Sequence, residues 1–407
     1  MHLRLLELDE FRSFRSLRLE IDPAGFRAVG SNASGKSTLM EAITMLATTR
    51  SPRTSSEREL ANWESGVAFG MSPYARLRGE FTRADGVHSI AIGLSVDEGG
   101  RSGIKKSVQF DEQPARAIDV VGQFKTVLFS PDDVELLPGS PGGRRRFLDL
   151  AISQARRTYL RGLSRYTRVL EQRNGLLRSL SRESGTTSAR RAAQELPFWD
   201  SELVAAATIV LSERAVYVAG LNDLAREHFG RLTGLDSLEI IYQPQRLPAI
   251  DGLPVAATRN DLELTRLQQS LAAQLSRTLN EVRAEELRRG VTAVGPHRDD
   301  LSFRVEGVDL GKFGSRGQQR LALVATKLAE VDLLQREAGE PPVLLLDDVL
   351  SELDRRHRRL VVEAIAVRPA QVCVTSTELS DLDVPGLSHL PILQVASGQV
   401  VRTENVA

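Results

Sequence analysis

A loop between Gly30 and Ser37 combines two glycines with a lysine and hydroxyl groups, in the order Gly-Ser-Asn-Ala-Ser-Gly-Lys-Ser. Its glycines allow backbone N–H groups to turn inward around a phosphate, and a strand predicted over 26–29 leads into it. A helix predicted over 38–47 follows, so the positive end of the helix dipole faces the same point. Lys36 is predicted to reach the β- and γ-phosphates of ATP, and Ser37 to bind Mg²⁺. The predicted nucleotide contacts are Gly30, Ser31, Asn32, Ala33, Ser34, Gly35, Lys36, Ser37 and Thr38.

Two adjacent carboxylates follow a short apolar run near the end of the chain. Residues 343–346 are Val-Leu-Leu-Leu, the pattern of a buried strand, and Asp347 and Asp348 come next. Ligands sit at the carboxyl ends of strands in open α/β sheets, so we expect both acids at a ligand site. Asp347 is predicted to hold Mg²⁺, either directly or through another ligand of the ion, and Asp348 to orient the attacking water in hydrolysis. The alternative is a strand that ends in solvated acids, which the Ser-Glu-Leu-Asp sequence at 351–354 disfavours.

A third anion-binding pattern lies at residues 315–320, Ser-Arg-Gly-Gln-Gln-Arg. It opens a helix predicted over 317–337, so a hydroxyl and free N–H groups meet at the helix N-terminus. The pattern contains no lysine, so it suits a phosphate that is already held by another molecule. We therefore predict that Ser315, Gly317 and Gln318 cover the nucleotide of a second copy of the chain in a head-to-head dimer. An ordinary helix N-cap with serine at the cap is the alternative.

The elements that must position these loops come from both ends of the chain. Alternating strands begin at the N-terminus, and a β-rich stretch with strands near 76–81, 89–96 and 107–110 follows the first helix. From about residue 143 to residue 289 the sequence is rich in Leu, Ala and Arg and predicts helices. Strand patterns return at 301–305, 343–346 and 372–375. The predicted domains are 1–128 and 293–407, two halves of one α/β head, with a helical arm domain, 129–292, inserted between them.

Composition favours a soluble globular protein of 407 residues, with 41% hydrophobic and 26% charged residues. The longest apolar run, at 204–211, is far shorter than the ~20 residues of a spanning helix, and no cleavable leader pattern opens the chain. The single cysteine, Cys373, excludes an internal disulfide. We therefore expect a cytoplasmic protein with no membrane partner.

Positive charge is concentrated in one segment, although Lys+Arg and Asp+Glu both total 53. Between residues 144 and 191 arginines greatly outnumber acids, and such an excess attracts a polyanion. Four of these arginines share one face of a predicted helix. These four, Arg157, Arg161, Arg165 and Arg168, are predicted to contact DNA, and the alternative is an arm that binds another protein.

Taken together, the chain resembles the RecF-type DNA repair ATPases, in the superfamily that also contains the SMC proteins. Besides the three motifs above, Gln172-Arg-Asn174 is family-like, and 347–354, Asp-Asp-Val-Leu-Ser-Glu-Leu-Asp, is the most family-specific stretch. Other family-like segments are 11–14, 39–43, 129–133, 139–141, 144–149 and 295–300. The resemblance implies an ABC-type ATPase head with a β-rich subdomain and an inserted α-helical arm. It also implies that Arg12, after the first strand, lies near the nucleotide phosphates.

By the same resemblance the protein would dimerise on ATP, hydrolyse it slowly as a DNA-stimulated switch, and bind single-stranded, gapped or junction DNA. It would help RecR/RecO-like mediators to load recombinase in recombination, replication, DNA damage repair and the SOS response. Asp348 stands where transport ATPases have Glu, and Ser376 or Thr377 where they have a switch His, which favours slow turnover. The alternative is the ABC ATPase subunit of a membrane transporter, which the missing His and the arginine-rich insertion disfavour. An SMC-like tether would need a far longer middle section.

Overall fold

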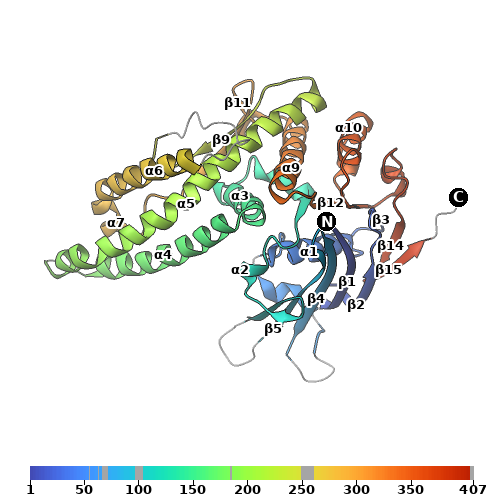
Figure 1. Cartoon of the computed structure of the whole chain (residues 1–407), viewed down its shortest axis with the longest axis horizontal. Coiled ribbons are helices and arrows are strands. Elements are labelled where there is room, and N and C mark those ends of the chain that lie inside the picture. Colours follow the sequence, from blue (N-terminus) through green and yellow to red (C-terminus); the bar gives the residue numbers. More distant parts are fainter. Residues whose placement is uncertain are drawn as a thin grey trace. The chain divides into compact units, whose positions relative to one another are not determined.

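The computed structural model describes residues 1–54, 56–62, 64–66, 72–96, 104–183, 186–248 and 261–403. The chain forms two compact units. The first joins both chain ends, Met1–Asp133 and Lys327–Ala407, and the second is Val134–Thr326 (Figure 1). The head is therefore assembled from segments far apart in the sequence, and a middle segment forms a body of its own.

One sheet of the first unit is parallel except at one edge, in the order β15-β14-β3-β13-β12-β8. The strands are β3 (Gly25–Val29), β8 (Thr126–Phe129), β12 (Val343–Asp347), β13 (Val372–Ser376), β14 (Ile392–Ala396) and β15 (Gln399–Thr403). Strands β3, β12 and β13 are buried along their whole length, and β8 is buried at all but one position, as expected for strands covered on both faces. Leu346 pairs with both Val374 and Phe129, which places the carboxyl ends of β12, β13 and β8 at one edge.

The second sheet of this unit is antiparallel, in the order β2-β1-β4-β5-β6-β7. Its strands are β1 (His2–Phe11), β2 (Phe14–Glu20), β4 (Tyr74–Arg83), β5 (Gly86–Val96), β6 (Ile104–Phe110) and β7 (Gln113–Pro114). Leu77, Phe81 and Ile92 lie among its buried side chains, and alternate positions are polar, as in a sheet with one face on the core.

Helix α1 (Lys36–Thr48) packs against strands of both sheets, including β4 and β12. Leu39, Ile43 and Leu46 are fully buried in a core that takes side chains from both sheets. Among its described residues the unit also contains α2 (Ala117–Val120), α10 (Arg355–Ala366) and the 3-10 turns η1 (Glu57–Leu60), η4 (Leu350–Glu352) and η5 (Leu379–Leu382), while η3 (Pro131–Leu136) begins here and ends in the second unit. The loop before α1 is thus anchored on the most buried helix of the head.

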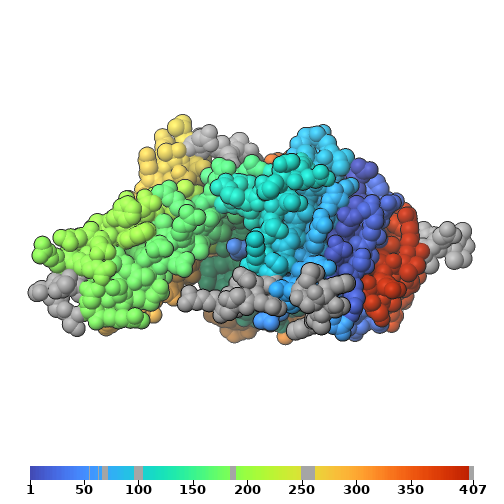
Figure 2. Space-filling view, turned by 90° about the horizontal axis from the view of Figure 1, so that it is seen from below, coloured from blue at the N-terminus to red at the C-terminus, as the bar shows by residue number. Residues whose placement is uncertain are grey.

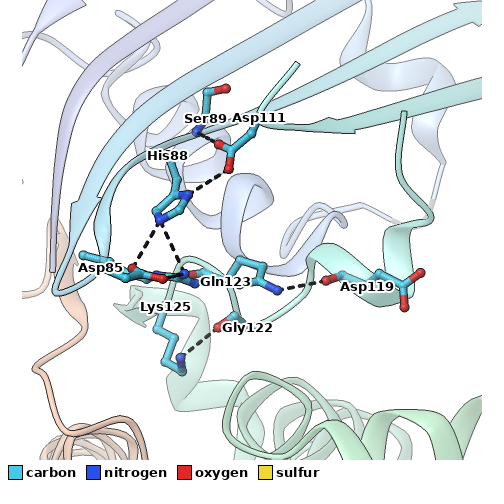
Figure 3. A network of polar contacts seen from close by, with 9 residues as sticks. Asp85, His88, Ser89, Asp111, Asp119, Gly122, Gln123 and Lys125 are labelled. Carbon is cyan, nitrogen blue, oxygen red and sulfur yellow. Dashed lines mark hydrogen bonds and ion pairs between the residues drawn. The ribbon is translucent and has the colours of Figure 1, made fainter. Parts of the chain in front are cut away.

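A polar network surrounds His88 beside the β4–β5 turn of the antiparallel sheet (Figure 3). His88 lies between Asp111, 2.8 Å from its Nδ1, and Asp85, 3.2 Å from its Nε2, and its ring stacks on Phe110. Asp111 also accepts a hydrogen bond from the backbone N–H of Ser89. Because these groups come from the β4–β5 turn and the end of β6, the network ties the hairpin to its neighbouring strand.

The second unit is mainly helical. Its helices are α3 (Pro141–Ala155), α4 (Arg157–Arg182), α5 (Thr186–Thr233), α6 (Asp261–Glu281), α7 (Arg283–Arg289) and α8 (Leu310–Phe313), and α9 (Arg316–Ala338) begins here and ends in the first unit. Helices α4 and α6 both pack on α5 (Figure 1). Arg173 of α4 is fully buried and contacts Glu286 Oε2 at 2.6 Å and Asp200 Oδ1 at 2.8 Å. A buried arginine without such partners would be strongly unfavourable, so these pairs fix the helix packing.

A small antiparallel sheet explains where this unit ends. Strand β9 (Leu238–Gln243) pairs with β10 (Asp300–Val305), which pairs with β11 (Val308–Asp309). The sequence prediction placed 293–326 in the head, whereas the compact second unit extends to Thr326. Pairing of β10 with β9 is the physical reason, because it joins those residues to the helical unit.

One helix among the described residues is long and apolar enough to pass a test for membrane spans, Ala189–Thr233. However, 72% of its most apolar window is buried inside the structure. A core helix of a globular protein gives this pattern, so the segment is weak evidence for a membrane span.

Candidate nucleotide-binding site

The loop 30–37 connects β3 to α1, as its spacing predicted. Gly35, the residue before α1, has φ +115°, a conformation that side-chain-bearing residues rarely adopt. A Cβ on Gly30 would stand 2.2 Å from the carbonyl oxygen of Val395. Both glycines are therefore required by the backbone path. This path leaves the first N–H groups of α1 without intrahelical partners, which is the arrangement that binds phosphate.

Lys36 is buried, and its ammonium donates to the carbonyl oxygens of Gly30, at 2.7 Å, and Ser31, at 2.9 Å. Burial lowers the pKa of Lys36, while the negative charges of Asp348 and Asp347 oppose that shift. The hydroxyl oxygen of Ser34 is buried and has no hydrogen-bond partner within the described structure. A buried hydroxyl without a partner is unusual in a folded protein, and in this loop it marks a group able to meet an incoming oxygen.

The predicted magnesium ligands lie together. Ser37 Oγ donates to Asp347 Oδ1 at 3.0 Å, and Thr375 Oγ1 donates to the same oxygen at 2.8 Å. Burial raises the pKa of Asp347, and the two hydroxyl donors oppose the shift. A hydroxyl and a carboxylate from α1 and β12 therefore present oxygen atoms, which Mg²⁺ prefers, at one point.

Asp348 follows at the end of β12 with φ +52°, in the left-handed region. Its backbone N–H donates to Thr375 Oγ1 at 3.0 Å, and Ser351 Oγ donates to its Oδ1 at 3.0 Å. One hydrogen bond therefore holds the backbone of Asp348 and another holds its side chain, and the residue lines the same cavity as Lys36 and Ser37.

This cavity has a volume of about 470 Å³ and is lined by loop residues, including Lys36 and Asp348. Arg12, predicted from resemblance to lie near the phosphates, also lines it, and so do four residues that the sequence analysis did not single out: Ser13, Arg53, Glu59 and Asn62. Arg12 Nε and Nη2 donate to the two carboxylate oxygens of Glu41 at 2.7 and 2.8 Å. An isolated Glu within an apolar helix sequence was the available signal for this buried partner.

The predicted trans-acting loop lies in the second unit. Ser315 is the residue before α9, and its N–H donates to Gln318 Oε1 at 3.0 Å while Gln318 N–H donates to Ser315 Oγ at 3.3 Å. This reciprocal pair is a capping box, one form of the serine N-cap that the alternative interpretation expected. All four residues 315–318 are exposed, and a Cβ on Gly317 would meet nothing within 4 Å. The fold of this chain gives no steric reason for glycine at that position.

The arginines predicted to contact DNA lie on the exposed side of α4. Within the described part of the chain, Arg157, Arg161 and Arg168 have no ion-pair partner, whereas Arg165 pairs with Glu202 at 2.7 Å. Helix α4 falls in the green part of the chain, which lies on the surface shown in Figure 2. Other arginines of the segment serve the fold: Arg144 pairs with Asp300, Arg156 with Glu213, and Arg173 with Glu286. The excess of free positive charge is therefore smaller than the sequence count indicated.

A parallel sheet with a phosphate loop and an acidic strand end at one edge, joined by α1 to an antiparallel sheet, defines the class of P-loop ATPase heads. The RecF/RecN/SMC N-terminal domain family matches residues 2–383. The DNA replication and repair protein RecF of Thermomicrobium roseum is 42% identical over 98% of this chain and 99% of its own length. RecF of Chloroflexus aurantiacus is 41% identical, and RecF of Bacillus subtilis 35% identical, with nearly complete coverage of both chains. The chain belongs to the RecF family.

Two solved structures of the recombination mediator protein RecF, described as bound to ATP and to an ATP analogue in the RecFOR pathway, are similar to this chain. Their TM-scores are 0.83 and 0.81, each at 27% identity, and the matches cover 99% of this chain and 98% of the other. The predicted fold class, an ABC-type ATPase head with a helical arm, is confirmed.

Proposed function

We propose that this protein is an ATP-binding DNA replication and repair protein whose nucleotide site lies at the carboxyl edge of the parallel sheet. The observation that carries the proposal is the meeting of Lys36, Ser37 and Asp348 in one cavity, with Asp347 bonded to Ser37. The names of the RecF relatives, and the ATP in the similar RecF structures, support the same activity.

The residues present fit a magnesium nucleotide. The N-terminus of α1 and the ammonium of Lys36 can bind the phosphates, and the hydroxyl of Ser34, which has no hydrogen-bond partner among the described residues, offers a further donor. Ser37 and Asp347 would hold Mg²⁺, which when bound draws charge from the phosphate oxygens. Gly30 and Gly35 keep the backbone close enough to wrap the phosphates, and Arg12 adds positive charge from the cavity wall.

Hydrolysis is assigned to Asp348 and Lys36. Asp348 orients the attacking water, since its side chain is fixed by Ser351 at the cavity wall. Aspartate is one methylene shorter than the glutamate of transport ATPases, and this favours slow turnover suited to a switch. Lys36→Arg keeps the charge but changes the donor geometry, so nucleotide should bind while hydrolysis fails.

A second copy of the chain completes the site in this proposal. Ser315, Gly317 and Gln318 cover the nucleotide of the partner copy, and dimerisation therefore depends on ATP. The exposure of 315–318 and the open space beside Gly317 support this role, because neither is needed by the fold of one copy.

The polyanion in this proposal is DNA in single-stranded, gapped or junction form, which stimulates the ATPase. The free arginines on α4 are the proposed contact, and RecR/RecO-like mediators, recombinase loading and the SOS response follow by family resemblance. We place the protein in the cytoplasm. The relatives named above are DNA repair proteins, which does not favour the transporter alternative.

The test is binding of gapped duplex, single-stranded and blunt duplex DNA, with and without ATP, while light scattering records the oligomeric state. ATP-dependent dimers with tighter, salt-sensitive DNA binding are the expected result. ATP binding with no DNA affinity in any nucleotide state would overturn the repair assignment.

A further inference from the structure

Glu41 is a buried carboxylate on the helix that carries the phosphate loop. Its side chain is 0% exposed, and its neighbours on α1 are apolar residues of the core. An ionised carboxylate in such a position is costly unless it is paired and hydrogen-bonded. Its ion-pair partner is Arg12, which lines the cavity.

Arg12 meets Glu41 in a two-point arrangement. Its Nε donates to Oε2 at 2.7 Å and its Nη2 to Oε1 at 2.8 Å, so one edge of the guanidinium is fixed in plane. An arginine has five N–H donors, and the Nη1 group therefore retains both of its donors for another ligand. Arg12 lines the cavity with a side chain that is 22% exposed, so an anion in the cavity is the candidate ligand for these two donors.

The backbone of Arg12 is held as firmly as its side chain. Its N–H donates to the carbonyl oxygen of Leu60 at 2.8 Å, and Asn62 Nδ2 donates to its carbonyl oxygen at 2.6 Å. Its φ of +51° is uncommon for a residue with a side chain, so these bonds oppose local strain. The guanidinium is thus placed before any ligand arrives.

Arg53 shares the same carboxylate. Its Nη1 lies 3.7 Å from Glu41 Oε2, and it also lines the cavity, with 46% of its side chain exposed. Ser51 Oγ donates to Glu41 Oε1 at 2.5 Å and accepts from the backbone N–H of Arg53 at 3.0 Å. One buried carboxylate therefore organises two cations that line the same cavity as the phosphate loop.

We infer that Glu41 is a positioning residue that holds Arg12, together with Arg53, as a preorganised cationic wall for the phosphates of the nucleotide. The inference rests on the proposed function and deepens it, since it adds Arg53 to the binding residues and assigns a role to Glu41. Preorganisation matters because the ordering of a long side chain then costs no binding free energy when the anion enters.

The experiment is a double-mutant cycle on the full chain, with the dissociation constant of a fluorescent ATP analogue as the readout. Glu41→Gln and Arg12→Gln should each weaken binding by about tenfold, the lower range for a charge-assisted hydrogen bond. The double variant should also lose about tenfold rather than about a hundredfold, because both changes remove one interaction. Additive losses would overturn the inference, since they would mean that Glu41 acts independently of Arg12.

The matched control is Glu64→Gln. Glu64 pairs with Arg15 on the same β1–β2 hairpin, but both side chains are exposed, at 71% and 65%. Removal of the Glu64 charge should leave nucleotide affinity unchanged. An equal decrease of affinity in Glu64→Gln and Glu41→Gln would contradict a specific role for Glu41. If Glu41→Gln fails to fold, Arg12→Lys tests the same point, because an ammonium cannot make the two-point contact.

Arg12→Lys should lose about as much affinity as Arg12→Gln, and affinity like that of the wild-type protein would overturn the inference. Failure of the wild-type protein itself to bind the analogue would instead refute the proposed function on which the inference rests.

Discussion

Ser37 Oγ lies 3.0 Å from Asp347 Oδ1, although 310 positions separate the two residues in the chain. Ser37 lies in the first turn of α1 and Asp347 ends β12, so the parallel sheet brings two distant segments of the chain to one point. Thr375, at the end of the neighbouring strand, bonds to the same carboxylate oxygen. Three elements therefore define the proposed magnesium position before any ion is bound.

Removal of the Asp347 charge should abolish the dependence of ATP binding on Mg²⁺. Asp347→Asn keeps an oxygen for the two hydroxyl donors but gives Mg²⁺ a weaker, neutral ligand. We expect wild-type affinity for ATP to fall by about tenfold or more when EDTA replaces Mg²⁺, and the variant to show the same weak affinity in both buffers. Isothermal titration in both buffers measures this difference.

The control for this prediction is Asp132→Asn, because Asp132 is an exposed acid just after β8, the strand beside β12. That variant should respond to EDTA as the wild-type protein does. An Asp347→Asn protein whose binding still needs Mg²⁺ would contradict the metal assignment.

Local patterns predicted most of the head because its motifs are continuous in sequence. The phosphate loop, α9 and the buried strands β12 and β13 lie within a residue or two of the predicted ranges. Strand β9 was missed, because it is short, stands in a long helical segment and gains its partner β10 only in the folded unit.

The side-chain partners were harder to predict than the elements. Arg12 and Glu41 are 29 positions apart: the isolated Glu41 in an apolar helix indicates a buried acid, but neither local sequence specifies that Arg12 is its partner. Likewise, Arg144, Arg156 and Arg173 are part of a basic segment, yet the fold uses them in ion pairs. A charge count alone cannot distinguish such residues from a free surface.

Gly317→Ala should separate folding from dimerisation. Gly317 lies in the first turn of α9 with open space around it, so alanine fits and stabilises the helix by up to about 1 kcal/mol. In the proposed dimer the added methyl group would face the partner's nucleotide. We therefore expect unchanged ATP binding, an equal or higher melting temperature, and loss of the ATP-dependent dimer in light scattering.

Ser315→Arg places a larger obstacle at the same loop and should likewise leave ATP binding intact while abolishing the dimer. The comparison is Gly175→Ala on α4, another helical glycine with open space beside it. That variant should dimerise normally. Normal dimerisation of both loop variants would refute the shared site.

Reversal of the free charges on α4 should weaken DNA binding and its dependence on salt together. Arg157, Arg161 and Arg168 are exposed and without ion-pair partners among the described residues. If each neutralises one phosphate, the triple change to Glu should lower the slope of log affinity against log salt by about 2 to 3. Fluorescence anisotropy with a labelled gapped duplex at several salt concentrations measures this slope.

The matched variant is Arg231→Glu, which reverses an exposed arginine on α5 that already pairs with Glu227. DNA affinity and salt slope should change little there. A triple α4 variant with an unaltered slope would show that the phosphates are bound elsewhere.

The turn that contains His297 and Asp299 predicts two opposite effects of acid on stability. His297 Nε2 donates to the carbonyl oxygen of Thr292 and its Nδ1 accepts from Tyr166, which requires a neutral ring. Burial lowers the pKa of His297 from 6.5 to about 4. Burial raises the pKa of Asp299 from 3.8 to about 6, although Tyr242 and the N–H of Gln245 donate to it.

The signs follow from proton binding in the folded and unfolded states. Between about pH 6.5 and 4 the unfolded chain protonates His297 while the folded protein does not, so the free energy of unfolding falls as pH falls. Between about pH 6 and 3.8 the folded protein holds the extra proton on Asp299, so the free energy of unfolding rises as pH falls. Each contribution is at most roughly 3 to 3.5 kcal/mol, at about 1.4 kcal/mol per pKa unit, and the two largely cancel.

Single substitutions should expose each contribution. Asp299→Asn removes the compensating group, so its free energy of unfolding should fall more steeply than that of the wild-type protein from pH 6.5 to pH 4. His297→Asn removes the buried imidazole, so its stability should fall less or rise over the same range. Urea unfolding at pH 4.5, 5.5 and 7 measures these slopes. Parallel pH profiles for the wild-type protein and both variants would show that neither group titrates abnormally in the folded state.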